Sequence, residues 1–141
     1  MTQEIKESNE KKKKYLKEYK AATVAAQIIK NEIEQLRLDK ICPTVINDGM
    51  PHASTCSDLS SYAAELTELE EKLMIARYKR IKLHTEISDN IEAMEDETEK
   101  CVLRLKYLQC MTWEEVAVYM NYSWRQIHNF HASALNHFMI A

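Results

Sequence analysis

The sequence predicts an all-α protein, in which a long N-terminal antiparallel helical hairpin precedes a C-terminal helix-turn-helix domain. One Gly and two Pro in 141 residues leave few positions that interrupt helices. Pro43, Gly49 and Pro51 fall in one short window, so a single break separates two long segments. Apolar residues recur at three- and four-residue steps in both segments, as on one helical face. We therefore predict a hairpin over 1–96, with a loop at 41–57, and a second domain over 97–141.

The first predicted helix runs from Glu7 to Lys40. Its apolar stripe consists of Tyr15, Tyr19, Ala22, Ala26, Ile29, Ile33 and Leu36. Such a helix would be about 50 Å long, which is more than one globular core covers. The Lys11–Lys14 run precedes the stripe. We interpret the run as a solvated helix start, with an auxiliary contact to phosphate as the alternative.

The second predicted helix runs from Asp58, its expected N-cap, to Met94. Its apolar seam consists of Leu59, Tyr62, Leu66, Leu69 and Leu73, and resumes after a slip at Leu83, Ile87 and Ile91. The acidic residues Glu65, Glu68, Glu70 and Glu71 face away from the seam. Because the seam is longer than one small domain can cover, we expect self-association, most simply as a two-fold dimer.

The cysteines indicate neither disulfides nor a metal centre. Cys42, His52 and Cys56 are spaced irregularly in the Pro/Gly segment and match no closed zinc pattern. We expect Cys101 and Cys110 to be reduced and to act as small core residues. The chain has no long apolar stretch and begins with a charged segment, so we expect a cytoplasmic protein without a membrane span or signal peptide.

A third helix is predicted to begin near Glu97, where Asp96–Glu97 suits the positive end of the helix dipole. Its spacing turns one face inward, formed by Cys101, Leu105 and Leu108 with Val102 at its flank. The charged residues Lys100, Arg104 and Lys106 are expected to lie outside this face.

Two capping-box signatures, Thr112–Glu115 and Ser123–Gln126, predict two closely spaced helix starts. The first helix can then extend only from Trp113 to about Met120. Asn121 tolerates the positive φ that a tight turn requires, and Ala117 permits close helix approach. The apolar contacts are expected from Val116, Met120, Ile127, Phe130 and Leu135. This pattern predicts a helix-turn-helix, with an ordinary helical hairpin as the alternative.

The second of these helices is the candidate recognition helix. Helical spacing turns Trp124, Arg125, His128, Asn129 and Ala132 outward. An arginine can pair with guanine and an asparagine with adenine. The predicted DNA-binding residues are Thr112, Ser123, Trp124, Arg125, Gln126, His128 and Asn129.

Gln126 and Trp124 on this helix each allow more than one role. Gln126 is divided between its cap and a groove contact, and for Trp124 packing over the preceding helix is favoured over a sugar or thymine contact. We expect His128 and His131 to face solvent or phosphate, because two ligands without a third do not form a metal site. The sequence has no glycine-rich phosphate loop or nucleophile elbow, so no enzymatic activity and no cofactor are predicted.

Charge is distributed unevenly along the chain. Residues 1–40 carry ten Lys/Arg and seven Asp/Glu, residues 41–96 carry five and eleven, and residues 97–141 carry four of each. Neutralisation of DNA phosphates supplies most non-specific DNA affinity. Because residues 97–141 have no net charge, we do not expect this domain to bind DNA tightly on its own.

The C-terminal motifs resemble region 4 of sigma-70-type factors and, more closely, the ArpU-like and RinA-like phage transcriptional regulators. The resemblance lies in Cys101–Leu108, Met111–Ala117, Tyr122–His128 and Ala132–Leu135. The long N-terminal helix, the loop around Asp48-Gly-Met-Pro51 and the Glu/Leu-rich helix are similar to the same family more loosely. Before Met111, this chain has Gln109–Cys110 where a glycine is common.

The resemblance implies a DNA-binding transcription regulator of phage or prophage type, with double-stranded DNA and RNA polymerase as partners. It also implies which residues contact the DNA bases, namely Trp124, Arg125, Gln126, His128 and Asn129. Two other functions stay open. One is a DNA-packaging component similar to a terminase small subunit, which also joins a helix-turn-helix to coiled helices. The other is a protein-interaction module that no longer binds DNA.

Overall fold

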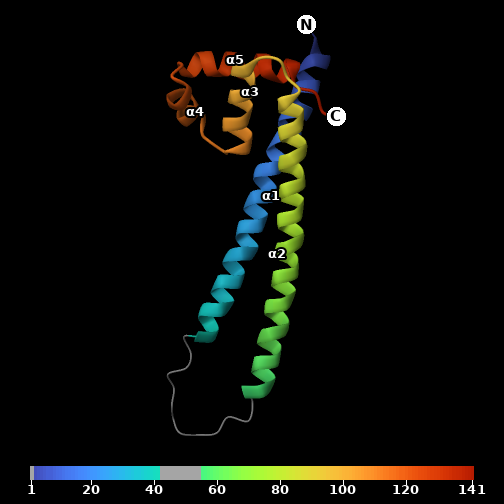
Figure 1. The fold of residues 1–141 in the computed structure, drawn as a ribbon, viewed down its shortest axis with the longest axis vertical. Helices are drawn as coiled ribbons and strands as arrows, with labels where there is room; N and C mark the ends of the chain where they lie inside the picture. The colour runs from blue at the N-terminus through green and yellow to red at the C-terminus, as the bar shows by residue number, and fades with distance from the viewer. Residues whose placement is uncertain (1, 42–54) are drawn as a thin grey trace. The chain divides into compact units, whose positions relative to one another are not determined.

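The computed structural model describes residues 2–41 and 55–141, and for residues 40, 41 and 55–58 it describes the backbone alone. The elements are α1 (Gln3–Ile41), α2 (Thr55–Glu92), α3 (Glu97–Leu103), a π-helical stretch η1 (Arg104–Leu108), α4 (Trp113–Met120) and α5 (Trp124–His137) (Figure 1). Every regular element in these ranges is helical, which confirms the all-α class with a helical hairpin. Within the described ranges, no helix has both the length and the apolar character needed to cross a membrane.

The starts of the long helices lie earlier than predicted. α1 begins at Gln3 rather than Glu7, and α2 begins at Thr55, so the N-cap role predicted for Asp58 is wrong. Aspartate is favoured both at N-caps and within first turns, so its type alone does not locate a helix start. The predicted loop 41–57 and its Cys42–His52–Cys56 combination fall almost wholly outside the described residues.

Contacts divide the chain into two compact units. Unit 1 comprises Met1–Ala22 with Arg80–Ala141, and unit 2 comprises Thr23–Lys79. The boundary predicted from the sequence was placed at residue 96, within unit 1. Each long helix therefore contributes to both units, and the ends of α1 and α2 in unit 1 belong with the C-terminal helices.

Unit 2 is held by one apolar seam between α1 and α2. Ala26, Ile33 and Leu73 are buried there, with Ile29, Leu66, Leu69 and Ala76 packed against them. Arg37 forms an exposed ion pair with Glu70 at 3.2 Å. The predicted stripes thus pair with each other inside one chain, while Leu59 is exposed. Because α1 covers this seam within one chain, the self-association expected from the seam stays a prediction.

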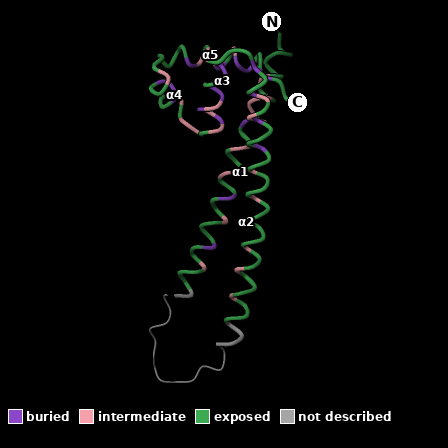
Figure 2. Tube along the Cα trace, in the orientation of Figure 1, coloured by how far each residue is buried: buried purple, intermediate pink, exposed green. Residues whose placement is uncertain are grey.

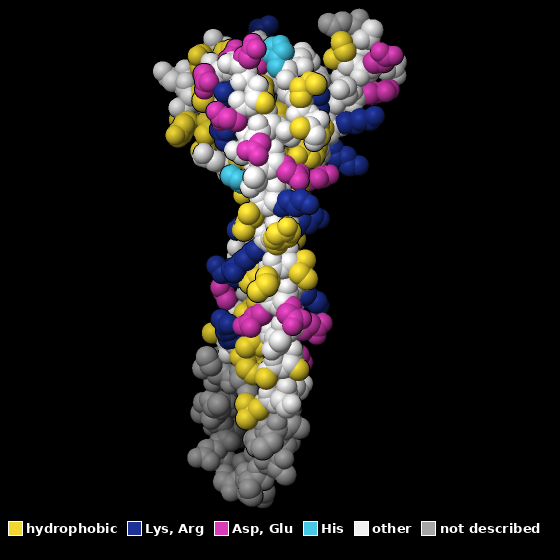
Figure 3. Space-filling view, turned by 45° about the vertical axis from the view of Figure 1, so that its right-hand side comes forward, with side chains coloured by type: hydrophobic (Ala, Val, Ile, Leu, Met, Phe, Trp, Pro, Cys, Tyr) yellow, Lys and Arg dark blue, Asp and Glu magenta, His cyan; other side chains and the backbone are white. Residues whose placement is uncertain are grey.

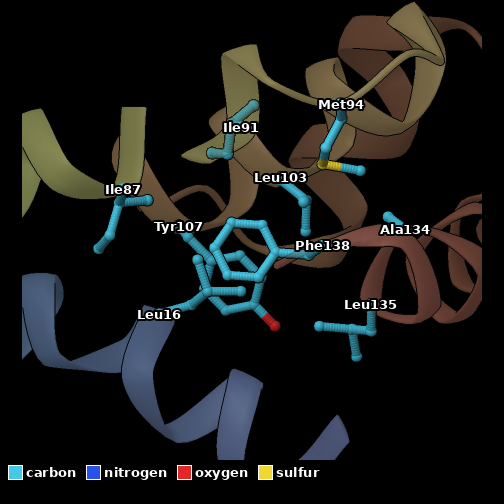
Figure 4. Close-up of a cluster of buried hydrophobic side chains, with 9 residues drawn as sticks. All are labelled: Leu16, Ile87, Ile91, Met94, Leu103, Tyr107, Ala134, Leu135 and Phe138. Carbon is cyan, nitrogen blue, oxygen red and sulfur yellow. The ribbon is translucent and has the colours of Figure 1, made fainter. Parts of the chain in front are cut away.

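The first core cluster of unit 1 joins the ends of α1 and α2 to α3, η1 and α5 (Figure 4). Phe138, directly after α5, and Leu16 are completely buried within it, although neither was among the predicted core residues. The cluster consists of Leu16, Ile87, Ile91, Met94, Leu103, Tyr107, Ala134, Leu135 and Phe138. Leu135 belongs to this cluster rather than to the contact between the last two helices.

The second core cluster of unit 1 lies between η1, α3, α4 and α5. Its buried members are Val102, Leu105, Val116, Ala117 and Ile127, with Met111, Trp113, Met120 and Phe130 packed against them. The predicted helix-turn-helix contacts of Val116, Met120, Ile127 and Phe130 are thereby confirmed, as is close packing at Ala117.

The inward face predicted for the third helix is confirmed for Leu105 and Leu108 but is wrong for Cys101. Cys101 is exposed, whereas Val102 and Leu103 are completely buried and belong to different clusters. Even Lys100 is buried, although it was expected outside the apolar face. Residues of this segment belong to both core clusters, much of the segment is coloured as buried or intermediate in Figure 2, and its π-helical turn changes the register further. A single-face periodicity therefore misplaces its side chains.

Two non-glycine residues of unit 1 have a left-handed backbone. Asn121 has φ 60°, as predicted for the turn between α4 and α5, and Cys110 has φ 56°. Such a conformation costs most residues about 1–2 kcal/mol, and Asn less. Cys110 is half-buried at a turn, where a glycine would be unstrained, so it is not the core residue expected.

Candidate nucleic-acid interface

The pair of helices α4 and α5 in unit 1 begins at a simple N-cap. The Thr112 hydroxyl accepts a hydrogen bond from the Glu115 amide at 3.2 Å. No return bond from the Glu115 side chain occurs in the described structure, so only half of the predicted capping box forms at this helix. At the other end of α4, the Tyr122 amide donates to the Ala117 carbonyl at 3.1 Å, which closes the turn through Asn121.

The start of α5 has the complete capping box. The Gln126 amide donates to the Ser123 hydroxyl at 3.2 Å, and the Gln126 side-chain oxygen accepts from the Ser123 amide at 3.0 Å. The prediction of this helix start is confirmed to the residue. The cap occupies the Gln126 oxygen, so only its NH₂ group is free to donate to a ligand.

Arg125 and Asn129 lie one helical turn apart on α5, and both are exposed. Neither side chain makes a hydrogen bond or ion pair within the part of the chain that the structure describes. Their donors and acceptors are therefore available to a ligand. Ala132, predicted on the same side, is also exposed.

Two indoles enclose the imidazole of His128. The Trp124 and Trp113 ring centroids lie 3.8 Å and 4.5 Å from that of His128. His128 Nε2 is buried and has no hydrogen-bond partner in the described residues. Trp124 remains 56% exposed and stacks on His128 of its own helix, so its packing over the preceding helix stays a prediction. His128 thus holds the exposed Trp124 ring in place more than it faces solvent.

His131 is buried, contrary to the expectation that it faces solvent or phosphate. Its Nε2 lies 2.6 Å from the Tyr107 hydroxyl, and its ring packs edge-on against Trp113. Burial, with smaller effects from Lys13 and His128, lowers the pKa of His131 to about 4. Burial also raises the pKa of Tyr107. Both groups are neutral at pH 7, so the hydrogen bond joins a neutral hydroxyl to a neutral imidazole, and the tautomer of His131 decides which of them donates.

A buried carboxylate ties α5 to α3. Glu99 accepts hydrogen bonds from the Ser133 hydroxyl at 2.5 Å and from His137 Nδ1 at 2.8 Å. The sequence analysis placed no buried acid here, because Glu99 stands in a strongly charged segment. Its spacing from Val102 and Leu103 on one helix was the available signal.

The basic N-terminal part of α1 contributes to the same unit. Lys106 Nζ lies 4.6 Å from the centroid of the Trp113 ring. Its pKa is lowered by burial and then by the positive charges of Lys20 and Lys17. Lys17 acts on His131 in the same way. Lys17 and Lys20 of α1 thus lie near Lys106, and Lys17 also lies near His131 of α5. The sequence analysis singled out neither of these two α1 lysines.

The Lys11–Lys14 run is partly structural. Lys12 Nζ donates to the Leu135 carbonyl at 2.8 Å, in the last turn of α5, where a cation complements the helix dipole. Lys13 pairs with Glu10 at 3.0 Å. The prediction of a freely solvated helix start is therefore wrong for Lys12.

An exposed apolar groove lies on α4, lined by Met111, Glu114, Glu115, Val118 and Tyr119. Val118 is 82% exposed. Among the described residues, no group of His, Cys, Asp and Glu has the arrangement of a metal site. Comparison of this chain with models of protein families, with characterised proteins and with solved structures finds no match.

Proposed function

We propose that this protein is a DNA-binding transcription regulator of phage or prophage type, acting in the cytoplasm without enzymatic activity or a cofactor. The observation that carries the proposal is the turn between α4 and α5. A short helix, a left-handed Asn121 and a capped longer helix leave Arg125 and Asn129 exposed at the start of α5. That is where helix-turn-helix proteins contact base edges in the major groove.

Lysines beside α5 supply charge that residues 97–141 lack. Lys17, Lys20 and Lys106 are near enough to affect one another's protonation or that of His131. In a complex they would contact phosphates, which position a protein on DNA without reading its sequence. This local basic group supports DNA binding in a domain whose own charges cancel.

Selection of bound sequences from random duplex DNA, with and without RNA polymerase, tests the proposal. On the selected site, Arg125→Ala and Asn129→Ala should each weaken binding by roughly 1–3 kcal/mol and relax the preference at one position. Arg77→Ala removes the same charge from an exposed position in unit 2 and should leave affinity unchanged. If both α5 variants stay folded and bind the selected site with wild-type affinity, this helix does not read the bases.

The lysines call for a different readout. Lys17→Gln and Lys20→Gln should weaken binding to all sequences alike, and each should reduce the slope of log K against log salt by about 0.9. Lys106→Ala would also remove a contact with Trp113. It would therefore mix a packing effect with the electrostatic effect.

A protein-interaction module is the second candidate, and the α4 groove favours it. Val118 and Tyr119 expose apolar surface, and Glu114 and Glu115 border it with negative charge. Exposed apolar patches commonly mark interaction sites. Val118→Asp should abolish binding of a protein partner such as RNA polymerase under this hypothesis, without changing DNA affinity. The packaging alternative would require a ring of subunits, which solution mass would reveal.

A further inference from the structure

Trp124 presents a large apolar ring at the start of α5, where it is 56% exposed. Hydrophobic side chains also lie among charged ones elsewhere on the surface of the protein, as Figure 3 shows, so exposure alone does not single out this residue. Its position on the helix does. At about 100° per residue, Trp124, Arg125 and Asn129 span about 140° of the helix surface, with Trp124 at one edge and Asn129 at the other. The apolar ring therefore belongs to the same face as two side chains that can read base edges.

The Trp124 ring is held in place through one imidazole. Its centroid lies 3.8 Å from that of His128, with the two planes tilted by 48°, and the His128 centroid lies 4.5 Å from that of Trp113. Trp113 in turn packs against the second core cluster and, edge-on, against His131. The row Trp113–His128–Trp124 therefore connects the exposed indole to the core of unit 1. A ring that is fixed in advance loses little conformational entropy when it binds a ligand.

His128 contributes the surface of its ring to this row. Its Nε2 atom is buried and has no hydrogen-bond partner among the residues that the structure describes. A buried nitrogen cannot exchange a hydrogen bond with a base, so His128 acts through Trp124 as a positioning residue.

We propose that the exposed face of Trp124 contacts the C5-methyl group of a thymine in the major groove, beside the bases read by Arg125 and Asn129. Among unmodified bases, thymine is the one that presents an apolar group in this groove. The other base edges there carry hydrogen-bonding groups, which an apolar ring face would leave without partners. This inference rests on the DNA binding proposed above, and it adds a base preference that needs no hydrogen bond.

Replacement of thymine by uracil in the DNA tests this contact without altering the protein. Each thymine of the selected site is replaced in turn, which removes a methyl group and leaves the base pair intact. At one position, uracil should weaken binding of the wild-type protein roughly fourfold, as expected for one buried methyl group. In Trp124→Ala, the same replacement should leave the affinity unchanged. At that position 5-methylcytosine should bind more tightly than cytosine, because it restores the methyl group.

Three further variants separate the contact from general effects on the fold. His128→Phe keeps a flat ring against Trp124 and should retain the preference for thymine over uracil, whereas His128→Ala should reduce that preference to below about twofold. Tyr78→Ala removes an aromatic side chain that is 70% exposed in unit 2, and it should retain both the affinity and the preference. Far-UV circular dichroism checks that each variant is folded.

Several results would overturn the contact: a selected site without thymine, an equal effect of uracil on the wild type and on Trp124→Ala at every position, or the same loss of affinity in Trp124→Ala on all sequences. The last of these would indicate a contact with the DNA backbone. If Arg125→Ala still weakens binding to the selected site, such a result refutes the thymine contact and leaves the proposed function in place. Selection of no sequence at all would refute both.

Discussion

The two compact units of this protein bury apolar surface in different ways. In unit 1, Leu16 of α1, Ile87 of α2 and Phe138 directly after α5 retain no exposed surface. In unit 2, the seam between two helices leaves 9% of Leu73 exposed. A two-helix contact encloses one face of each helix, whereas five helical segments can enclose a side chain from all directions. The enclosed core of unit 1 can therefore hold the start of α5, with Arg125 and Asn129, in one fixed position.

The position of the two tryptophans makes this difference measurable. Trp113 and Trp124 are the only tryptophans of the chain, and both belong to unit 1. Fluorescence then reports on unit 1 alone, whereas far-UV circular dichroism reports on the helices of both units.

The largest effect is expected from truncation of the enclosed core. Phe138→Ala should destabilise unit 1 by about 3–5 kcal/mol, because it removes a fully buried ring and leaves a cavity. Leu73→Ala should cost about 2 kcal/mol, at the low end for leucine, since the seam can close around the gap. Urea unfolding followed by fluorescence and by circular dichroism measures both. Equal losses in the two variants would contradict the contrast between the units.

Acid should destabilise unit 1 selectively, because of His131. Its pKa is about 4 in the folded protein and 6.5 in the reference state, so the unfolded chain binds more protons between these values. Its stabilising contribution is complete above pH 6.5 and is lost as pH falls toward 4, by about 3 kcal/mol in total. The groups that face it are Tyr107, Trp113, His128 and the lysines 13, 17 and 106.

The control for the acid effect is His131→Phe, which removes the titrating group but keeps a ring. Its fluorescence-detected melting temperature should fall less between pH 6.5 and 4 than that of the wild type. Parallel pH profiles would show that His131 is not the source.

Added side-chain volume in the core should also destabilise unit 1 more than unit 2, but the difference in stability should be smaller. Ala117→Leu places three extra carbons between α4 and the second core cluster, which costs about 1–3 kcal/mol. Ala26→Leu makes the same change in the seam of unit 2, where the helices can separate slightly, and should cost less. Thermal unfolding by circular dichroism compares them. Unchanged stability in Ala117→Leu would show that the register of the helix-turn-helix is wrong.

The smallest effect concerns hydroxyl groups on helices. Ser123→Ala should cost about 1 kcal/mol because it removes a cap acceptor from the start of α5. Thr112→Ala should cost no more, since its capping box is incomplete. Thr67 bonds the Ala63 carbonyl within α2, so Thr67→Ala should be neutral or slightly stabilising. Chemical denaturation resolves these differences, and a Thr67 effect equal to that of Ser123 would contradict the role of the cap.

The sequence by itself determined the features that depend on local interactions. Ser123–Gln126 and Thr112 specify the starts of α5 and α4, because a cap involves atoms only three residues apart. Asn121 marks the turn for the same reason, since its positive φ is a property of the residue. The periodicity of the sequence predicted the apolar stripes that meet at Ala26 and Leu73, because each helix of unit 2 buries a single face.

Only the tertiary structure decided which side chains of unit 1 are enclosed. Two clusters cover α3 and η1 from different sides, so one-face periodicity wrongly buried Cys101 and overlooked Leu103. His131 and Glu99 have polar partners, Tyr107 and Ser133, that are distant in sequence, and composition cannot reveal such pairs. The lysines of α1 approach α5 across more than a hundred residues, and long-range packing alone brings their charges beside the candidate recognition helix.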